Sequence, residues 1–184
     1  MDTWNPTRVI GLDVSLTGTG IANTTGWSTT IGQKNITTLP VQERARAIKT
    51  LAAKILLEIG TPDLVVIEAP SYASKGGGAH ERSGLWWWLV ERIASWESTE
   101  LVEVPPSLVK KYATSRGNAS KEQMVDAVAR RYPQYETGGD NNQCDAVVLA
   151  AMGADYLGHP ITDMPKTHQD ALLKVAWPEL EVAR

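Results

Sequence analysis

Two acidic residues each end an apolar run that is typical of a buried β-strand. Asp13 closes "VIGLD", and Glu68 closes "LVVIE" later in the chain. If the two strands are parallel neighbours, both carboxylates lie near the carboxyl ends of their strands, roughly 5 Å apart by strand spacing. Two acids held so close in a partly buried site do not both ionise without a cation nearby. The pair therefore predicts a site for a hard divalent ion, above all Mg²⁺.

A third acid, Asp145, fits the same site. It shares a helical stripe with Leu149, Met152 and Tyr156, so it lies on the face that packs on the sheet. An unpaired carboxylate on that face is costly, which favours a metal ligand. Each acid also has a simpler interpretation: Asp13 as a turn acid, Glu68 as a buried acid paired with an arginine, and Asp145 as an acid stabilised by the helix dipole.

A fourth ligand is less well defined. Asn142 lies one turn before Asp145 on the same helix face and could supply an oxygen, or it could only cap the helix. Asp140 competes with Asn142 for the role of fourth ligand. The sequence leaves the choice between them open.

The elements that position these residues follow from periodicity. A first strand over about residues 8–14 leads into two further strands separated by Gly26, and together they read as an antiparallel meander. Helical and extended patterns then alternate. In chain order they are a helix ending at Gly60, a strand over 63–69, a helix over 79–98, a strand over 100–106, a short helix opened by Pro106, a helix capped by Ser120 and a helix over 142–158.

This order predicts an α/β fold with one mixed five-stranded sheet and helices on both faces. The expected strand order is 3-2-1-4-5, with the second strand antiparallel and strands 1 and 4 parallel neighbours. We expect one domain over residues 1–158, and we expect residues 159–184 to form a peripheral C-terminal tail with a helical turn or two.

Composition excludes several classes. The sequence has 184 residues, 42% hydrophobic and 21% charged, with no apolar stretch of the ~18 residues that a membrane span needs and no secretory signal pattern. One cysteine excludes an intramolecular disulfide and a cysteine zinc site. We therefore expect a cytoplasmic protein. The net charge of −3 gives no global attraction to nucleic acid, but a local basic patch is formed by Lys110, Lys111, Arg116 and Lys121, followed by Arg130 and Arg131.

These residues together resemble the RuvC family of Holliday junction resolvases, which belongs to the RNase H-like superfamily. "IGLDVSLTGTGIA", "LVVIEAP" and "NQCDAVVLAAMG" resemble the three motifs that carry the family's metal-binding acids, and they place these acids at Asp13, Glu68 and Asp145. "VKKYATSRGNASKEQM" resembles the segment whose two lysines face DNA, here Lys110 and Lys121. The resemblance covers about residues 8–157 and is greatest to the compact phage-type members.

The chain departs from the family at two positions. The family's other helix acid, three positions before Asp145, is Asn142 here. The aromatic residue that follows the catalytic glutamate and enters the junction centre corresponds to Tyr72, one position late.

The resemblance implies a structure-specific endonuclease that resolves four-way and other branched DNA. It implies two Mg²⁺ per active site, for which Mn²⁺ could substitute, and paired nicks that leave 5'-phosphate ends. If the gene is from a phage, the site of action is the host cytoplasm. DNA contacts are expected at Lys110, Lys111, Arg116, Lys121 and Tyr72. No nucleotide cofactor and no membrane partner are expected.

Two cuts in one junction need two active sites, so we expect a homodimer. Trp86, Trp87 and Trp88 span about 200° of a helix and cannot all face the sheet. The tryptophans left outside are the expected dimer contacts.

Three other functions compete with the resolvase. An actin-like kinase has a similar Gly- and Thr-rich hairpin but needs a second domain, for which this chain is too short. An RNase H-like nuclease acting on other substrates, such as RNA–DNA hybrids, would share the fold. A non-catalytic module that binds branched DNA could have lost one ligand at Asn142.

Overall fold

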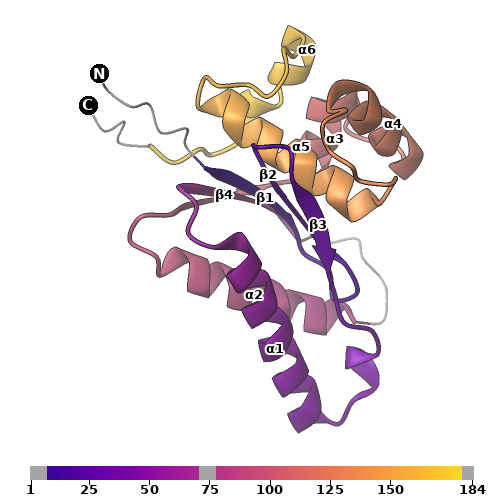
Figure 1. Ribbon diagram of the computed structural model, residues 1–184, viewed down its shortest axis with the longest axis vertical. Coiled ribbons are helices and arrows are strands. Elements are labelled where there is room, and N and C mark those ends of the chain that lie inside the picture. Colours follow the sequence, from indigo (N-terminus) through magenta and orange to yellow (C-terminus); the bar gives the residue numbers. More distant parts are fainter. Residues whose placement is uncertain (1–7, 71–77, 180–184) are drawn as a thin grey trace.

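The structure is a computed structural model that describes residues 8–70 and 78–179. Its centre is a five-stranded sheet with the order β3-β2-β1-β4-β5 (Figure 1). β2 runs antiparallel to both neighbours, and β4 runs parallel to β1 and β5. This confirms the predicted topology. The strands are β1 (Val9–Asp13), β2 (Thr19–Asn23), β3 (Ser28–Ile31), β4 (Leu64–Glu68) and β5 (Glu100–Val104).

Helices cover both faces of the sheet, as predicted (Figure 1). α1 and α2 lie on one face, and α5 lies across the other with α3 and α4 packed outside it. The helices are α1 (Val41–Ile59), α2 (Ala79–Ala94), α3 (Pro106–Thr114), α4 (Lys121–Arg131), α5 (Asn141–Tyr156) and α6 (Lys166–Gln169), with short 3-10 turns at Ile36–Thr38 and Leu172–Lys174. The predicted helix starts at Pro106 and at the Ser120 cap are confirmed.

Strand alternation decides which side chains meet α5. Val9 and Val66 belong to the buried cluster on the α5 side, whereas Ile10, Leu12 and Ile67 belong to the cluster under α1 and α2. Successive side chains of a strand point to opposite faces. Asp13, the last residue of β1, and Glu68, the last residue of β4, lie an even number of positions after Val9 and Val66 respectively. The side chains of both acids therefore point toward α5.

Two glycines let α5 approach the sheet at backbone distance. A Cβ on Gly20 would lie 1.9 Å from the Asn142 carbonyl oxygen, and a Cβ on Gly11 would lie 2.0 Å from the Ala146 carbonyl oxygen. No side chain fits in that space, so only glycine permits this packing. The first two turns of α5 are thereby held against β1 and β2.

The C-terminal segment packs on α3 and α5. His168 is buried, and its Nδ1 lies 2.6 Å from the Tyr112 carbonyl oxygen. Ala171 is fully buried in the same cluster as α5. The helical turns expected in this segment are present, and they contribute to the core on that side of the sheet. The division of the chain into a domain and a tail stays a prediction.

No helix in the described ranges has the length and apolar character needed to cross a membrane.

Candidate active site

The register of β1 and β4 makes Asp13 and Glu68 neighbours. Leu12 pairs with Ile67 in the parallel ladder, so the next residues along the two strands are Asp13 and Glu68. Adjacent strands lie about 4.8 Å apart, and both acids are on the α5 face. Both side chains are half-buried. The sequence prediction that these acids lie side by side at the strand ends is confirmed.

α5 brings a third carboxylate to the same edge of the sheet. Asp140 is the N-cap of α5, because its carboxylate accepts a hydrogen bond of 2.9 Å from the Gln143 backbone N–H. The Asn142 backbone then contacts Gly20, which is the register partner of Asp13. Asp145 follows on the next turn, and its charge acts on both strand acids.

Burial holds all three acids toward their neutral forms, and repulsion by neighbouring acids adds to this effect at Asp13 and Glu68. Burial, and then the charge of Asp145, raises the pKa of Asp13 to about 7. Burial, and then the charges of Asp13 and Asp145, raises the pKa of Glu68 to about 9. Burial raises the pKa of Asp145 to about 6, against the opposing charges of two lysines. A bound cation would relieve this repulsion.

The carboxylate oxygens of the three acids are ligands that suit a hard divalent ion, but the three carboxylates do not converge on one point. None of the three forms an ion pair or a side-chain hydrogen bond with another described residue, so their oxygens are free to accept a cation. Within the described ranges, however, no three His, Cys, Asp or Glu side chains are grouped closely enough to hold a metal ion. Binding Mg²⁺ would therefore require side-chain rotation at this edge. Carboxylates on two strand ends can make such a change without moving the backbone.

The two candidates for a fourth ligand have different surroundings. Asp140 caps α5, which is the role that the sequence had offered to Asn142, so capping by Asn142 is wrong. The Asn142 side chain lies against Gly18, with its Nδ2 atom 2.9 Å from where a Cβ would stand. It therefore faces the β1–β2 turn, and its role as a ligand stays a prediction.

Two of the predicted basic residues lie near enough for their charges to act on the carboxylates. Lys110 of α3 acts on Glu68 and Asp145, and Lys121, the first residue of α4, acts on Asp13 and Asp145. The capping box of Ser120, satisfied in both directions, fixes the start of α4, where Lys121 lies. Both lysines come from the α5 side of the sheet.

The other predicted basic residues lie elsewhere. Arg116 lines a separate hollow between α3 and α4, together with Arg130 and Arg131. Lys111 is not among the described cations whose charges act on the three acids. A DNA contact by Arg116 or Lys111 stays a prediction.

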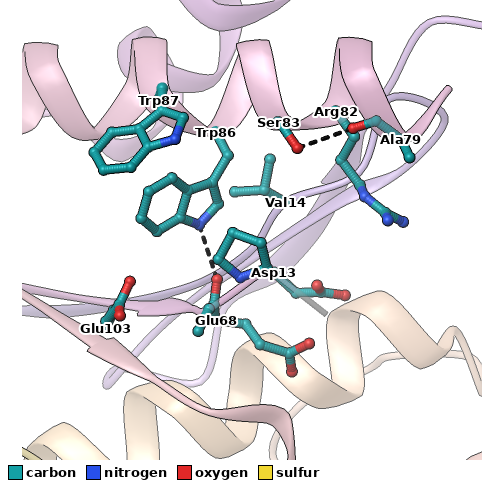
Figure 2. A pocket seen from close by; sticks show the side chains of 11 residues that line it. Asp13, Val14, Glu68, Ala79, Arg82, Ser83, Trp86, Trp87 and Glu103 are labelled. Atoms are coloured by element: carbon teal, nitrogen blue, oxygen red, sulfur yellow. Dashed lines mark hydrogen bonds between the residues drawn. The ribbon is translucent and has the colours of Figure 1, made fainter. Parts of the chain in front are cut away.

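A cavity of about 630 Å³ opens beside Asp13 and Glu68, between the strand ends and α2. Figure 2 shows Trp86 above Glu68, and its indole N–H donates a hydrogen bond of 2.9 Å to the Glu68 carbonyl oxygen. Arg82 lines the same cavity, and its charge lowers the pKa of both acids.

Sequence reasoning missed Arg82, although a signal was present. Arg82 lies four residues before Trp86 and seven before Leu89, on the stripe of α2 that faces the sheet. A charged residue on such a stripe is uncommon unless it serves a site at the end of the buried face.

The tryptophan prediction is right in part. The three tryptophans do not share one environment: Trp86 is 5% exposed, whereas Trp87 is 64% and Trp88 41% exposed. Trp86 as a dimer contact is therefore wrong, because its ring is packed inward and bonded to β4. Dimer contacts by Trp87 and Trp88 stay predictions. Tyr72, expected to contact DNA, lies outside the described residues.

No protein-family model matches the sequence, and no curated protein matches it either. Solved structures do match. RuvC from Thermus thermophilus has a TM-score of 0.57 and 18% identity, over 83% of this chain and 98% of that chain. The chain has the RuvC-type resolvase fold. The fowlpox virus resolvase, solved with Holliday junction DNA, has a TM-score of 0.51 and 14% identity, over 82% and 98%.

A third resolvase fits the same fold. The yeast mitochondrial Holliday junction resolvase Ydc2 has a TM-score of 0.53 and 16% identity, over 80% of this chain and 77% of that chain. At these identities the likeness concerns the fold alone.

Proposed function

We propose that this chain is a structure-specific endonuclease that hydrolyses the phosphodiester backbone of four-way DNA junctions with the help of divalent metal ions. The observation that carries the proposal is the placement of Asp13, Glu68 and Asp145 at one sheet edge, where the charge of Asp145 acts on both strand acids and no ion pair with another described residue neutralises them. Two further observations support the proposal. Cations lie around the acids, and the fold is one that includes Holliday junction resolvases.

Each residue has a role that its position favours. Asp13 closes the strand against which α5 packs at Gly11, and together with Glu68 and Asp145 it would hold the Mg²⁺ ions. Bound ions of this kind activate water and stabilise the leaving oxygen of a phosphodiester. Lys121 and Lys110 would contact phosphates of the DNA, which position the strand without reading its sequence.

The substrate is proposed to be branched DNA, with paired nicks that leave 5'-phosphate ends. Two scissile strands in one junction need two active sites, and a homodimer supplies them. The exposed rings of Trp87 and Trp88 on α2 favour that helix as the contact, because large apolar side chains left on a surface are typical of homodimer interfaces.

One observation favours a second candidate, a module that binds branched DNA and does not cut it. The described carboxylates do not form a ready metal cluster, and an amide, Asn142, stands where the resembling family has another acid. Such a module would keep the basic residues and lose the need for metal. Cleavage by the purified protein separates the two functions.

The test compares the parent with Asp13→Asn on a labelled synthetic four-way junction and on a linear duplex of the same sequence. With Mg²⁺ we expect the parent to nick the junction far faster than the duplex. Asp13→Asn should still bind the junction but lose cleavage by about 10³-fold or more, because it removes a metal ligand in a partly buried site. Asp163→Asn, an exposed acid of the C-terminal segment, is the matched control and should cut normally.

Binding without cleavage by the parent would establish the non-catalytic module. Normal cleavage by Asp13→Asn would show that Asp13 holds no metal ion. Faster cleavage of an RNA–DNA hybrid than of the junction would replace the resolvase with an RNase H-like activity.

A further inference from the structure

Arg82 is the one described cation on the α2 side of the sheet whose charge acts on Asp13 and Glu68. Its half-buried side chain lines the cavity with Asp13 and Glu68, and its guanidinium forms no ion pair or hydrogen bond with another described residue. In Figure 2 the side chain leaves α2 toward the strand ends, and the guanidinium lies on the same side of the cavity as the Asp13 carboxylate. Five N–H donors are therefore available to a ligand there.

The turn of α2 that carries Arg82 is fixed on both sides. The neighbouring Glu81 is buried and forms an ion pair of 2.7 Å with Arg44 of α1, and Arg44 also donates to the Leu39 carbonyl oxygen. One turn later, Trp86 is bonded to the Glu68 backbone. The guanidinium is thus carried by a turn that is fastened to α1 and to the strand that ends in a catalytic acid. A fixed support is what a residue that orients a substrate needs.

The three cations around the acids come from two layers. Lys110 and Lys121 come from α3 and α4, outside α5, and Arg82 comes from α2 on the other face of the sheet. A DNA strand crossing the sheet edge would meet the lysines on one side of the acids and Arg82 on the other. The lysine ammonium is a point charge, whereas the guanidinium is a planar fork that matches two oxygens of one phosphate.

We propose that Arg82 binds the phosphate next to the scissile one in the cleaved strand, gripping two of its oxygens and setting the strand direction across the acids. This inference rests on the proposed nuclease function. Arg82 is a positioning residue in this role. The acids and the lysines act at the scissile phosphate, and Arg82 holds the neighbouring nucleotide in place. The alternative is that Arg82 only offsets the charge of the acids when no metal ion is bound.

The test pairs variants of Arg82 with junctions in which single phosphates near the cut are replaced by neutral methylphosphonates. Single-turnover cleavage in Mg²⁺ is measured for the parent, Arg82→Gln, Arg82→Lys and the control Arg46→Gln, which changes an exposed arginine of α1. A charge-assisted contact is worth about tenfold to a hundredfold in rate. Melting temperatures check that each variant is folded.

We expect one phosphate, adjacent to the scissile one, at which the methylphosphonate slows the parent and Arg46→Gln by about tenfold or more. At that position it should slow Arg82→Gln by less than about threefold, because the contact is already missing. Arg82→Lys should fall between, since it keeps the charge and loses the fork.

In one outcome, the parent cuts the unmodified junction while Arg82→Gln is as sensitive as the parent to the methylphosphonate at every position. That result would overturn the role of Arg82 and leave the nuclease function intact. The same holds if Arg82→Gln only increases the affinity for Mg²⁺, which is the result expected of a charge-balancing residue. A parent that cuts no junction would instead overturn the nuclease function itself.

Discussion

Replacing Glu68 by glutamine should make the metal-free protein more stable at alkaline pH. Burial and two neighbouring acids raise the pKa of Glu68 from 4.5 to about 9. A carboxyl group whose pKa is raised by folding contributes stability that is complete below about pH 4.5 and is lost as the pH rises toward about 9. At pH 8 the loss has a ceiling of about 5 kcal/mol at 1.36 kcal/mol per pH unit.

Solvent reaches the half-buried Glu68 side chain, so a gain of about 1 to 2 kcal/mol is the expected size. In a chain of this length it corresponds to a rise of about 2–8 °C in melting temperature. Thermal unfolding of the parent and Glu68→Gln is measured in EDTA at pH 5 and pH 8. The difference should be large at pH 8 and small at pH 5. Glu103→Gln, an exposed acid of the same cavity, is the control and should change little at either pH.

Mg²⁺ should reverse the order of stability. The parent should gain stability when Mg²⁺ is added at pH 8, because a ligand that binds only the folded state stabilises it. Glu68→Gln should gain less, since it has one ligand fewer. If the parent in EDTA is at least as stable as Glu68→Gln at pH 8, the repulsion inferred at this sheet edge does not exist. If Mg²⁺ stabilises both proteins equally, Glu68 is not a ligand.

Two further predictions concern packing and assembly. Gly20→Ala should lower stability by about 1–3 kcal/mol and junction cleavage by about a hundredfold, because a methyl group 1.9 Å from the Asn142 carbonyl oxygen must push the start of α5 away from the strand acids. The melting temperature and the single-turnover rate check this prediction. A fully active variant would show that α5 need not approach so closely. Sedimentation at micromolar concentration should give the mass of two chains for the parent and of one chain for a Trp87→Ser, Trp88→Ser double variant. A parent that is monomeric both with and without junction DNA would contradict the predicted homodimer.

The fold was predictable because its determinants are local. Apolar runs, Gly26 and the prolines mark the elements, and the rule that parallel strands are joined through a helix then leaves few topologies. The strand acids were predictable for the same reason: each interrupts an apolar run at its carboxyl end, and the register of two adjacent strands follows once the strands are paired. The face of α5 on which Asp145 lies was predictable from helical periodicity.

Two features of the site were not predicted. The cap of α5 is Asp140 and not Asn142, because the Asp140 carboxylate accepts a hydrogen bond from the Gln143 backbone N–H. The sequence carries the signal for this cap, an aspartate three residues before a glutamine at the start of an apolar run. Trp86 and Trp87 are adjacent in sequence and differ in exposure because only one of them lies above the Glu68 carbonyl.

The placement of Arg82 has a larger consequence. The family resemblance directs attention to lysines in one segment, on α3 and α4, and these reach the acids only from the α5 side. A phosphate backbone that crosses a sheet edge has two sides, and a site with cations on one side alone would hold the strand without fixing its direction. Arg82 supplies the other side from a helix that packs on the opposite face of the sheet. Direction matters here because in-line attack on a phosphodiester requires the attacking oxygen, the phosphorus and the leaving oxygen to lie on one axis. An arginine on α2 beside Asp13 and Glu68 would supply that orientation from the side opposite the lysines.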